Sequence, residues 1–168
     1  MDEIINKVEG LDIITIDVKD FYSEGERVAL DISNFLDEGI LMEKSFRNKL
    51  KNFDWSIYNN KYVNVIVDKN LIIPSWAYLL ISYYLSESSK DYVIGDKKCL
   101  EEKLYNKSIN NLNINLYNDK KVIVKGCNDI PHIEYVYSEL TRKLSKTVFS
   151  LMYGEPCSRV PIFKKRLK

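Results

Sequence analysis

The sequence is short of the residue types that define several familiar protein classes. Its 168 residues include only 3 cysteines, 1 histidine, 6 glycines and 4 prolines. A small, odd number of widely spaced cysteines argues against a disulfide framework and is typical of a reducing compartment, so we expect a cytoplasmic protein. With 25 basic and 24 acidic residues the net charge is +1, which gives no reason to expect electrostatic capture of nucleic acid.

Long apolar runs and the common catalytic fingerprints are also missing. The longest apolar stretch, residues 71–85, is interrupted by Pro74, Ser75 and Ser82, so no membrane span is expected. The N-terminal sequence MDEIINKVEG is acidic and does not have the pattern of a signal peptide. No GxGxxG, GxxxxGK[ST] or GxSxG motif occurs, so neither a nucleotide-binding fingerprint nor a nucleophile elbow supports a reaction class.

The chain does carry clear secondary-structure patterns. Apolar residues at helical spacing predict four helices, at residues 43–53, 74–85, 98–106 and 132–144. Short Val- and Ile-rich runs predict six strands, at residues 11–18, 26–35, 62–67, 91–96, 121–126 and 147–155. From residue 43 the two kinds of element alternate. We therefore expect an α/β fold, with a mainly parallel sheet covered by helices.

The first two strands lie on either side of a Ser-Glu-Gly turn signal at residues 23–25. They are interpreted as a β-hairpin, or as two sequential strands, in an N-terminal β extension over residues 1–40. The length of the chain favours a single domain over residues 1–168.

An internal repeat subdivides the rest of that domain. Three matched pairs occur in the same order: IYNNKYVNV (57–65) with LYNDKKVIV (116–124), IPSWAY (73–78) with IPHIEY (130–135), and VIGD (93–96) with MYGE (152–155). Asn, Lys and Ile are common in this chain, so chance similarity is the alternative. The order of the matches favours duplicated β-α-β halves, at residues 43–96 and 97–168.

The repeat indicates where a functional site would lie. Ligands of open α/β sheets bind beyond the carboxyl ends of the strands. Cys127 and Cys157 each follow a predicted strand there, so both are candidate reactive residues, and Glu155 is a third. Cys127 also follows Gly126 and precedes a helix, which favours a thiolate. The alternative for both cysteines is that they are small buried side chains of the core.

Metal binding is the second possibility for the same residues. Cys127, Cys157 and His132 could provide three ligands for zinc, with Asp96 or Glu155 as a fourth. Alternatively, the cysteines of two subunits could hold an iron–sulfur cluster at the two-fold axis of a homodimer. Helix capping is the other interpretation of His132 and Asp96, because both precede predicted helices.

Five segments resemble a known family. In chain order they are DFYSEGERVALDISNFL, FRNKLKNFDWSIYNNKYV, PSWAYLL, VKGC and MYGEPCSRVPIFK. They are similar to an uncharacterised bacterial family, domain of unknown function 2480, from about Ile4 to Lys165. The resemblance implies small cytoplasmic proteins with no established activity. It also implies genes that often lie beside those for sulfur mobilisation and iron–sulfur cluster assembly.

Together these observations favour a cytosolic accessory factor in iron–sulfur cluster assembly, or in thiol and metal handling, that acts through Cys127 and Cys157. Iron–sulfur assembly proteins would be its partners. The alternative is a non-catalytic interaction or self-associating module with structural cysteines, using a face near Trp55 and Tyr58. An enzyme using Asp96 and Glu155 as a carboxylate pair is a third hypothesis, so enzymatic activity stays open at this point.

Overall fold

The computed structural model describes residues 13–166 of the chain. Contacts between residues divide it into two compact units: unit 1 consists of Met1–Ser23 and Tyr105–Lys168, and unit 2 consists of Glu24–Leu104. In chain order unit 2 is therefore nested between the first strand of unit 1 and the remainder of that unit. That the chain is a single domain, divided into halves at residues 43–96 and 97–168, stays a prediction.

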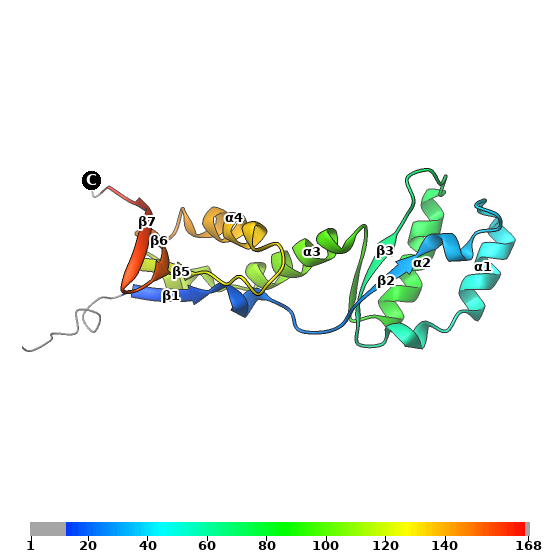
Figure 1. Cartoon of the computed structure of the whole chain (residues 1–168), viewed down its shortest axis with the longest axis horizontal. Coiled ribbons are helices and arrows are strands. Elements are labelled where there is room, and N and C mark those ends of the chain that lie inside the picture. The colour runs from blue at the N-terminus through cyan, green and yellow to red at the C-terminus, as the bar shows by residue number, and fades with distance from the viewer. Residues whose placement is uncertain (1–12, 167–168) are drawn as a thin grey trace, which may run out of the picture. The chain divides into compact units, whose positions relative to one another are not determined.

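Unit 1 is built on a four-stranded sheet in the order β1-β5-β6-β7. The first three strands are parallel and the last pair is antiparallel. Figure 1 shows α4 (Ile133–Leu144) lying along this sheet. The strands are β1 (Ile13–Asp17), β5 (Lys121–Lys125), β6 (Ser150–Glu155) and β7 (Ser158–Lys164).

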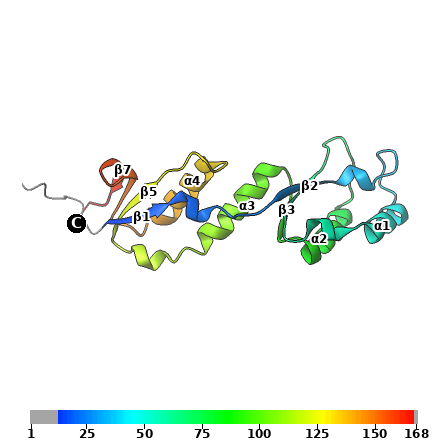
Figure 2. The ribbon, with the colours of Figure 1, turned by 60° about the horizontal axis from the view of Figure 1, so that its bottom comes forward.

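Unit 2 is built on a three-stranded parallel sheet in the order β2-β3-β4. The strands are β2 (Arg27–Asp31), β3 (Tyr62–Ile66) and β4 (Asp91–Ile94). Two helices, α1 (Glu43–Asn52) and α2 (Ser75–Ser88), belong to the same unit (Figure 2). The division between the units falls within α3 (Lys97–Asn110), so this helix contributes residues to both.

Four short 3₁₀ helices begin with the same kind of side-chain cap. They are η1 (Val18–Phe21), η2 (Ile32–Phe35), η3 (Trp55–Tyr58) and η4 (Ile114–Tyr117). Each begins after an Asp or Asn whose side chain accepts the backbone N–H two residues further on, at 2.8–3.2 Å. Short carboxylate and amide side chains favour such turns because they replace the missing helical hydrogen bonds.

The hydrophobic cores follow from the apolar spacing of the sequence. In α1, Phe46 and Leu50 are four residues apart, lie on one face and are fully buried. In β3, Val63 and Val65 share one face of the strand and pack into the same core. Unit 1 has its own core, to which β5 contributes Val122 and Val124 while α4 contributes Val136, Leu140 and Leu144.

The mixed α/β fold with mostly parallel strands is confirmed, but the predicted N-terminal β-hairpin is wrong. The two strands exist within residues 13–35, yet β1 pairs with β5 and β2 pairs with β3, in different sheets. Residues 11 and 12 of the predicted first strand lie outside the described residues. Strand β7 was not predicted. Within residues 13–166 no helix has both the length and the apolar character required to cross a membrane.

Candidate functional site

The carboxyl edge of the unit 1 sheet gathers most of the residues that the sequence singled out. Strands β1, β5 and β6 are parallel, with Asp17 opposite Lys125 and Val124 opposite Tyr153. Their carboxyl ends therefore meet at one edge of the sheet. The predicted placement of Cys127 after β5 and of Cys157 after β6 agrees with this topology.

Cys127 lies at this edge but is only 6% exposed, and it packs against the core of unit 1. Its Sγ accepts the backbone N–H of Asp129 at 3.2 Å. The ammonium of Lys19, on η1, donates to the Asp129 carboxylate at 3.3 Å. This hydrogen bond, followed by the charge interaction with Cys127, raises the pKa of Lys19 above its ordinary value. The thiol thus lies beside a backbone N–H and a cation.

Cys157 is exposed in the two-residue turn that joins β6 to β7. The turn requires a glycine just before it, because Gly154 has a φ of +114° and a Cβ there would lie 2.6 Å from the carbonyl oxygen of Ser158. Glu155 forms an ion pair with Lys125 of the neighbouring strand at 3.2 Å, and both side chains are about half exposed. Glu155 is therefore at the edge, with a basic partner.

His132 occupies the N-cap position of α4 with a left-handed φ of 53°. Its Nδ1 lies 3.7 Å from the carboxylate of Glu134. His132 thus stands at the start of α4, but its side chain makes no capping hydrogen bond, so only its position agrees with the capping interpretation. Within residues 13–166, no three His, Cys, Asp or Glu side chains are grouped as metal ligands. The ligand set of Cys127, Cys157 and His132 stays a prediction.

Asp96 acts as a helix cap in unit 2. Its Oδ1 accepts the backbone N–H of Cys99 at 2.8 Å, at the start of α3. Hydrogen bonding from Cys99 lowers the pKa of Asp96 below its ordinary value, so the carboxylate stays ionised. The capping interpretation of Asp96 is confirmed. Asp96 and Glu155 belong to different units.

Two tyrosines near Cys127 were not identified from the sequence. Tyr137 of α4 and Tyr153 of β6 pack edge to face, with ring centroids 5.6 Å apart and planes at 87°. A Cβ at Gly126 would overlap the Tyr153 hydroxyl and would lie 2.8 Å from the Tyr137 hydroxyl. Both hydroxyls therefore converge on the glycine that precedes Cys127. The only sequence signal for this arrangement is a glycine directly after a buried strand.

Burial, followed by a hydrogen bond with Tyr153, raises the pKa of Tyr137 to about 12. The backbone N–H of Cys127 acts in the opposite direction, because its hydrogen bond stabilises the phenolate. The Tyr137 hydroxyl is thus protonated at neutral pH, and it links α4 to the backbone of the cysteine.

The model of a family described as proteins of unknown function (DUF2480) matches residues 2–165. No curated protein and no solved structure matches the chain.

Proposed function

Because the chain belongs to the DUF2480 family, whose description assigns no activity, we propose a function from the residues at the carboxyl edge of unit 1. The proposed function is the handling of a thiophilic metal ion or of sulfur through Cys127 and Cys157, as an accessory step in iron–sulfur cluster assembly or thiol metabolism. The observation that carries it is that the two free thiols follow neighbouring parallel strands, β5 and β6, on one edge of the sheet.

The surroundings of the two cysteines support different roles for them. Cys157 is exposed and would meet a metal ion or a partner first. Cys127 is buried beside Lys19 and the Asp129 N–H, so it would be the more protected ligand.

Anaerobic purification followed by measurement of bound iron, sulfide and zinc tests the proposal. The purified protein is also incubated with Zn²⁺, or with Fe²⁺ and sulfide, and reanalysed after desalting. Retention of metal should fall sharply in Cys127→Ser and in Cys157→Ser. Cys99→Ser, which changes an exposed thiol of unit 2, is the matched control and should retain metal like the unmodified protein. No uptake, or uptake that neither serine variant lowers, contradicts the proposal.

Thiol titration in native buffer gives an independent readout. Cys157 should react quickly and Cys127 only slowly until denaturant is added, because Cys127 is 6% exposed. If neither of these two thiols reacts before denaturation, and no metal is bound, the proposed function fails.

The alternative function is self-association through the edge strand of unit 1, and one observation favours it. Strand β7 is the last strand of its sheet, and Val160 and Ile162 are 59% and 53% exposed. An exposed apolar edge strand can pair with a second copy of the chain. The face predicted near Trp55 and Tyr58 stays a prediction, and because Tyr58 is 4% exposed and lies in the core, other side chains would have to form it.

Sedimentation of the full chain tests this alternative. A dimer that Val160→Lys converts to monomers, while Cys157→Ser leaves it intact, would support self-association. A monomer at all accessible concentrations would contradict it.

We also propose that the two units arose by duplication of a single ancestral segment. Each unit contains, in the same order, a strand with its 3₁₀ helix, a helix, a second 3₁₀ helix, a strand, a helix and a strand. Asn60 and Asp119 support the same origin, since both have a left-handed φ just before the second strand. The residues after those strands then correspond, Val67 to Gly126 and Asp68 to Cys127.

A chimera tests the duplication. Residues 15–21 of unit 1 are replaced by residues 29–35 of unit 2, which keeps the capping aspartate and the final phenylalanine. The chimera should retain the circular dichroism spectrum and cooperative unfolding of the parent. Loss of both would contradict a common origin of these segments.

A further inference from the structure

A cavity of about 330 Å³ lies beside the carboxyl edge of unit 1, between α4 and the strands β6 and β7. Its size is near the lower end of the range found for small-molecule sites, roughly 300–1,000 Å³. The cavity is lined by Val124, Tyr137, Thr141, Leu151, Met152, Tyr153 and Ile162.

The lining has an apolar part and a polar part. Val124, Leu151, Met152 and Ile162 contribute only hydrocarbon or thioether surface. Tyr137, Tyr153 and Thr141 each add a hydroxyl, and the two phenolic hydroxyls converge on Gly126. None of the lining residues is charged. A phosphate or carboxylate would therefore lose its hydration without gaining a cationic partner.

The two tyrosine hydroxyls can serve as a hydrogen-bonding end. Tyr137 keeps its proton at neutral pH, and its oxygen accepts the backbone N–H of Cys127. Tyr153 is 40% exposed, so its ring can adjust to an occupant. An occupant with one carbonyl or hydroxyl oxygen could replace the hydrogen bond between the two tyrosines and leave no buried polar group unpaired.

Unit 2 has a cavity of about the same volume at the corresponding edge, but its lining includes Lys69 and Asp96 and lacks the pair of tyrosines. Val67 stands where unit 1 has Gly126, and Ile94 of β4 stands where β6 has Tyr153. A side chain at residue 126 would occupy the space in which the hydroxyls meet, so the glycine and the tyrosines depend on one another. The arrangement is specific to the unit that carries Cys127.

We propose that this cavity binds a small uncharged molecule with a flat apolar body, about the size of a substituted benzene ring, and one oxygen that reaches Tyr137 and Tyr153. The site does not depend on metal or sulfur chemistry at the cysteines. It is a ligand site in addition to the thiol edge, and it shares with that edge the backbone of Gly126 and Cys127.

Titration of the ¹⁵N-labelled full chain with acetophenone tests the proposal. Acetophenone has the required ring and a single carbonyl oxygen. Benzoate has a similar size but carries a charge. We expect saturable shifts of backbone amides at the lining residues with acetophenone, and at least tenfold weaker binding of benzoate. No saturable shifts at those residues, or equal binding of the two compounds, would overturn the proposal.

Two variants and one control locate the binding. Thr141→Trp should fill the cavity and abolish binding. Ser138→Trp, at an exposed position on the same helix outside the lining, should leave it unchanged. Tyr153→Phe keeps the ring and should weaken acetophenone binding roughly five- to tenfold, the cost of one hydrogen bond. This variant decides the question if Thr141→Trp does not fold. Binding that neither Thr141→Trp nor Tyr153→Phe alters would instead indicate a nonspecific apolar contact and contradict the site.

Discussion

The two units use their buried polar side chains for different purposes. In unit 2, Arg27 and Glu101 form a bidentate ion pair, with Nε to Oε1 at 2.9 Å and Nη2 to Oε2 at 3.1 Å. Their side chains are only 9% and 1% exposed. The guanidinium of Arg27 also lies over the ring of Tyr62, 5.0 Å from its centroid. These groups hold β2, β3 and the start of α3 together. In unit 1, the buried Cys127 and the half-buried Tyr137 lie at the carboxyl edge instead, beside a cavity.

The difference suggests a division of roles between similar sets of elements. Each sheet has a cavity of about 330 Å³ at the edge where α/β sheets bind ligands, but the lining in unit 2 includes the charged Lys69 and Asp96. The cavity of unit 1 is lined by uncharged residues and lies beside a buried thiol and two converging hydroxyls. Four predictions test whether the contrast holds, beginning with the largest expected effect.

Replacing Glu101 by Gln should lower the free energy of unfolding by about 3–5 kcal/mol, because the buried guanidinium of Arg27 loses the carboxylate that balances its charge. Chemical denaturation measures the loss. Glu102→Gln is the matched control. Its pair with Lys98 is more exposed and 3.8 Å long, so its loss should cost less than about 1 kcal/mol. Equal effects of the two changes would contradict the role assigned to the Arg27–Glu101 pair.

Gly126→Ala should lower the free energy of unfolding by about 1–3 kcal/mol, since the new Cβ would overlap the hydroxyls of Tyr153 and Tyr137. Thermal denaturation and near-ultraviolet circular dichroism measure the cost and the displacement of the rings. Part of the stability should return when Tyr153→Phe is added, because the nearest oxygen is then absent. If Gly126→Ala does not lower the stability, the close approach of the tyrosine hydroxyls to residue 126 is not required.

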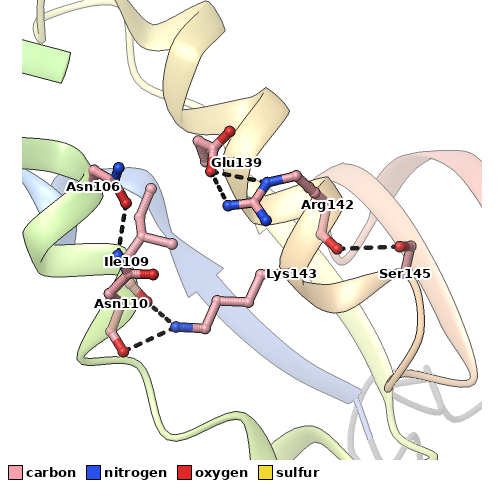
Figure 3. A network of polar contacts seen from close by, with 7 residues as sticks. All are labelled: Asn106, Ile109, Asn110, Glu139, Arg142, Lys143 and Ser145. Atoms are coloured by element: carbon pink, nitrogen blue, oxygen red, sulfur yellow. Dashed lines mark hydrogen bonds and ion pairs between the residues drawn. The ribbon is translucent and has the colours of Figure 1, made fainter. Parts of the chain in front are cut away.

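Lys143→Met should lower the free energy of unfolding by about 1 kcal/mol. The ammonium of Lys143 donates to the carbonyls of Ile109 and Asn110 at the end of α3, the second at 3.0 Å (Figure 3). It therefore caps the last turn of α3, where the carbonyl of Ile109 also accepts the backbone N–H of Leu112 at 3.1 Å. Lys146→Met, at an exposed position just after α4, is the control and should be nearly neutral. A neutral Lys143→Met would show that solvent replaces the cap.

The smallest expected effect concerns alkaline pH and Tyr137. Its pKa of about 12 in the folded chain exceeds the ordinary value near 10. The folded state therefore retains a proton that the unfolded state loses. The resulting stabilisation is complete below about pH 10 and is lost as pH rises toward about 12.

Tyrosinate absorbance and denaturation curves across that pH window measure the effect. Tyr137→Phe should remove this part of the alkaline loss of stability, and Tyr153→Phe should lower the pKa of Tyr137. Tyr58 of unit 2 serves as the control. Burial alone raises its pKa, so Tyr153→Phe should leave the pKa of Tyr58 unchanged. An alkaline transition that neither change affects would contradict the coupling of the two tyrosines.

Most of the secondary structure could be predicted from local patterns in the sequence. The helical spacing of Phe46 and Leu50 located α1, and the Val-rich runs located β3 and β5, because burial of one face imposes those periods. The pairing of the strands could not be predicted in this way, because it joins segments that are far apart in the sequence. The hairpin expected over residues 11–35 failed because β1 pairs with a strand more than a hundred residues away. Strand β7 was missed because Pro161 interrupts its pattern.

The sequence predicted that the candidate site lies at the carboxyl edge of a sheet, but it did not predict which side chains make contact there. The position of Cys127 after a strand followed from sequence order alone. Its burial and its neighbour Lys19 depend on the packing of η1 against the loop after β5, which no spacing in the sequence reports. The convergence of Tyr137 and Tyr153 likewise needs side-chain directions from two different elements.

The Arg27–Glu101 ion pair also bears on the order in which the chain folds. Residues 27 and 101 lie near the two ends of unit 2, and the pair brings them within 3 Å. Until unit 2 has folded, β1 must find β5 across a long flexible loop. Once unit 2 has closed, that loop is reduced to a short connection, and each halving of loop length lowers the entropic cost by about 0.6 kcal/mol. During synthesis, unit 2 can therefore form before β5 has been made, and β1 can pair with its partner strand only after that.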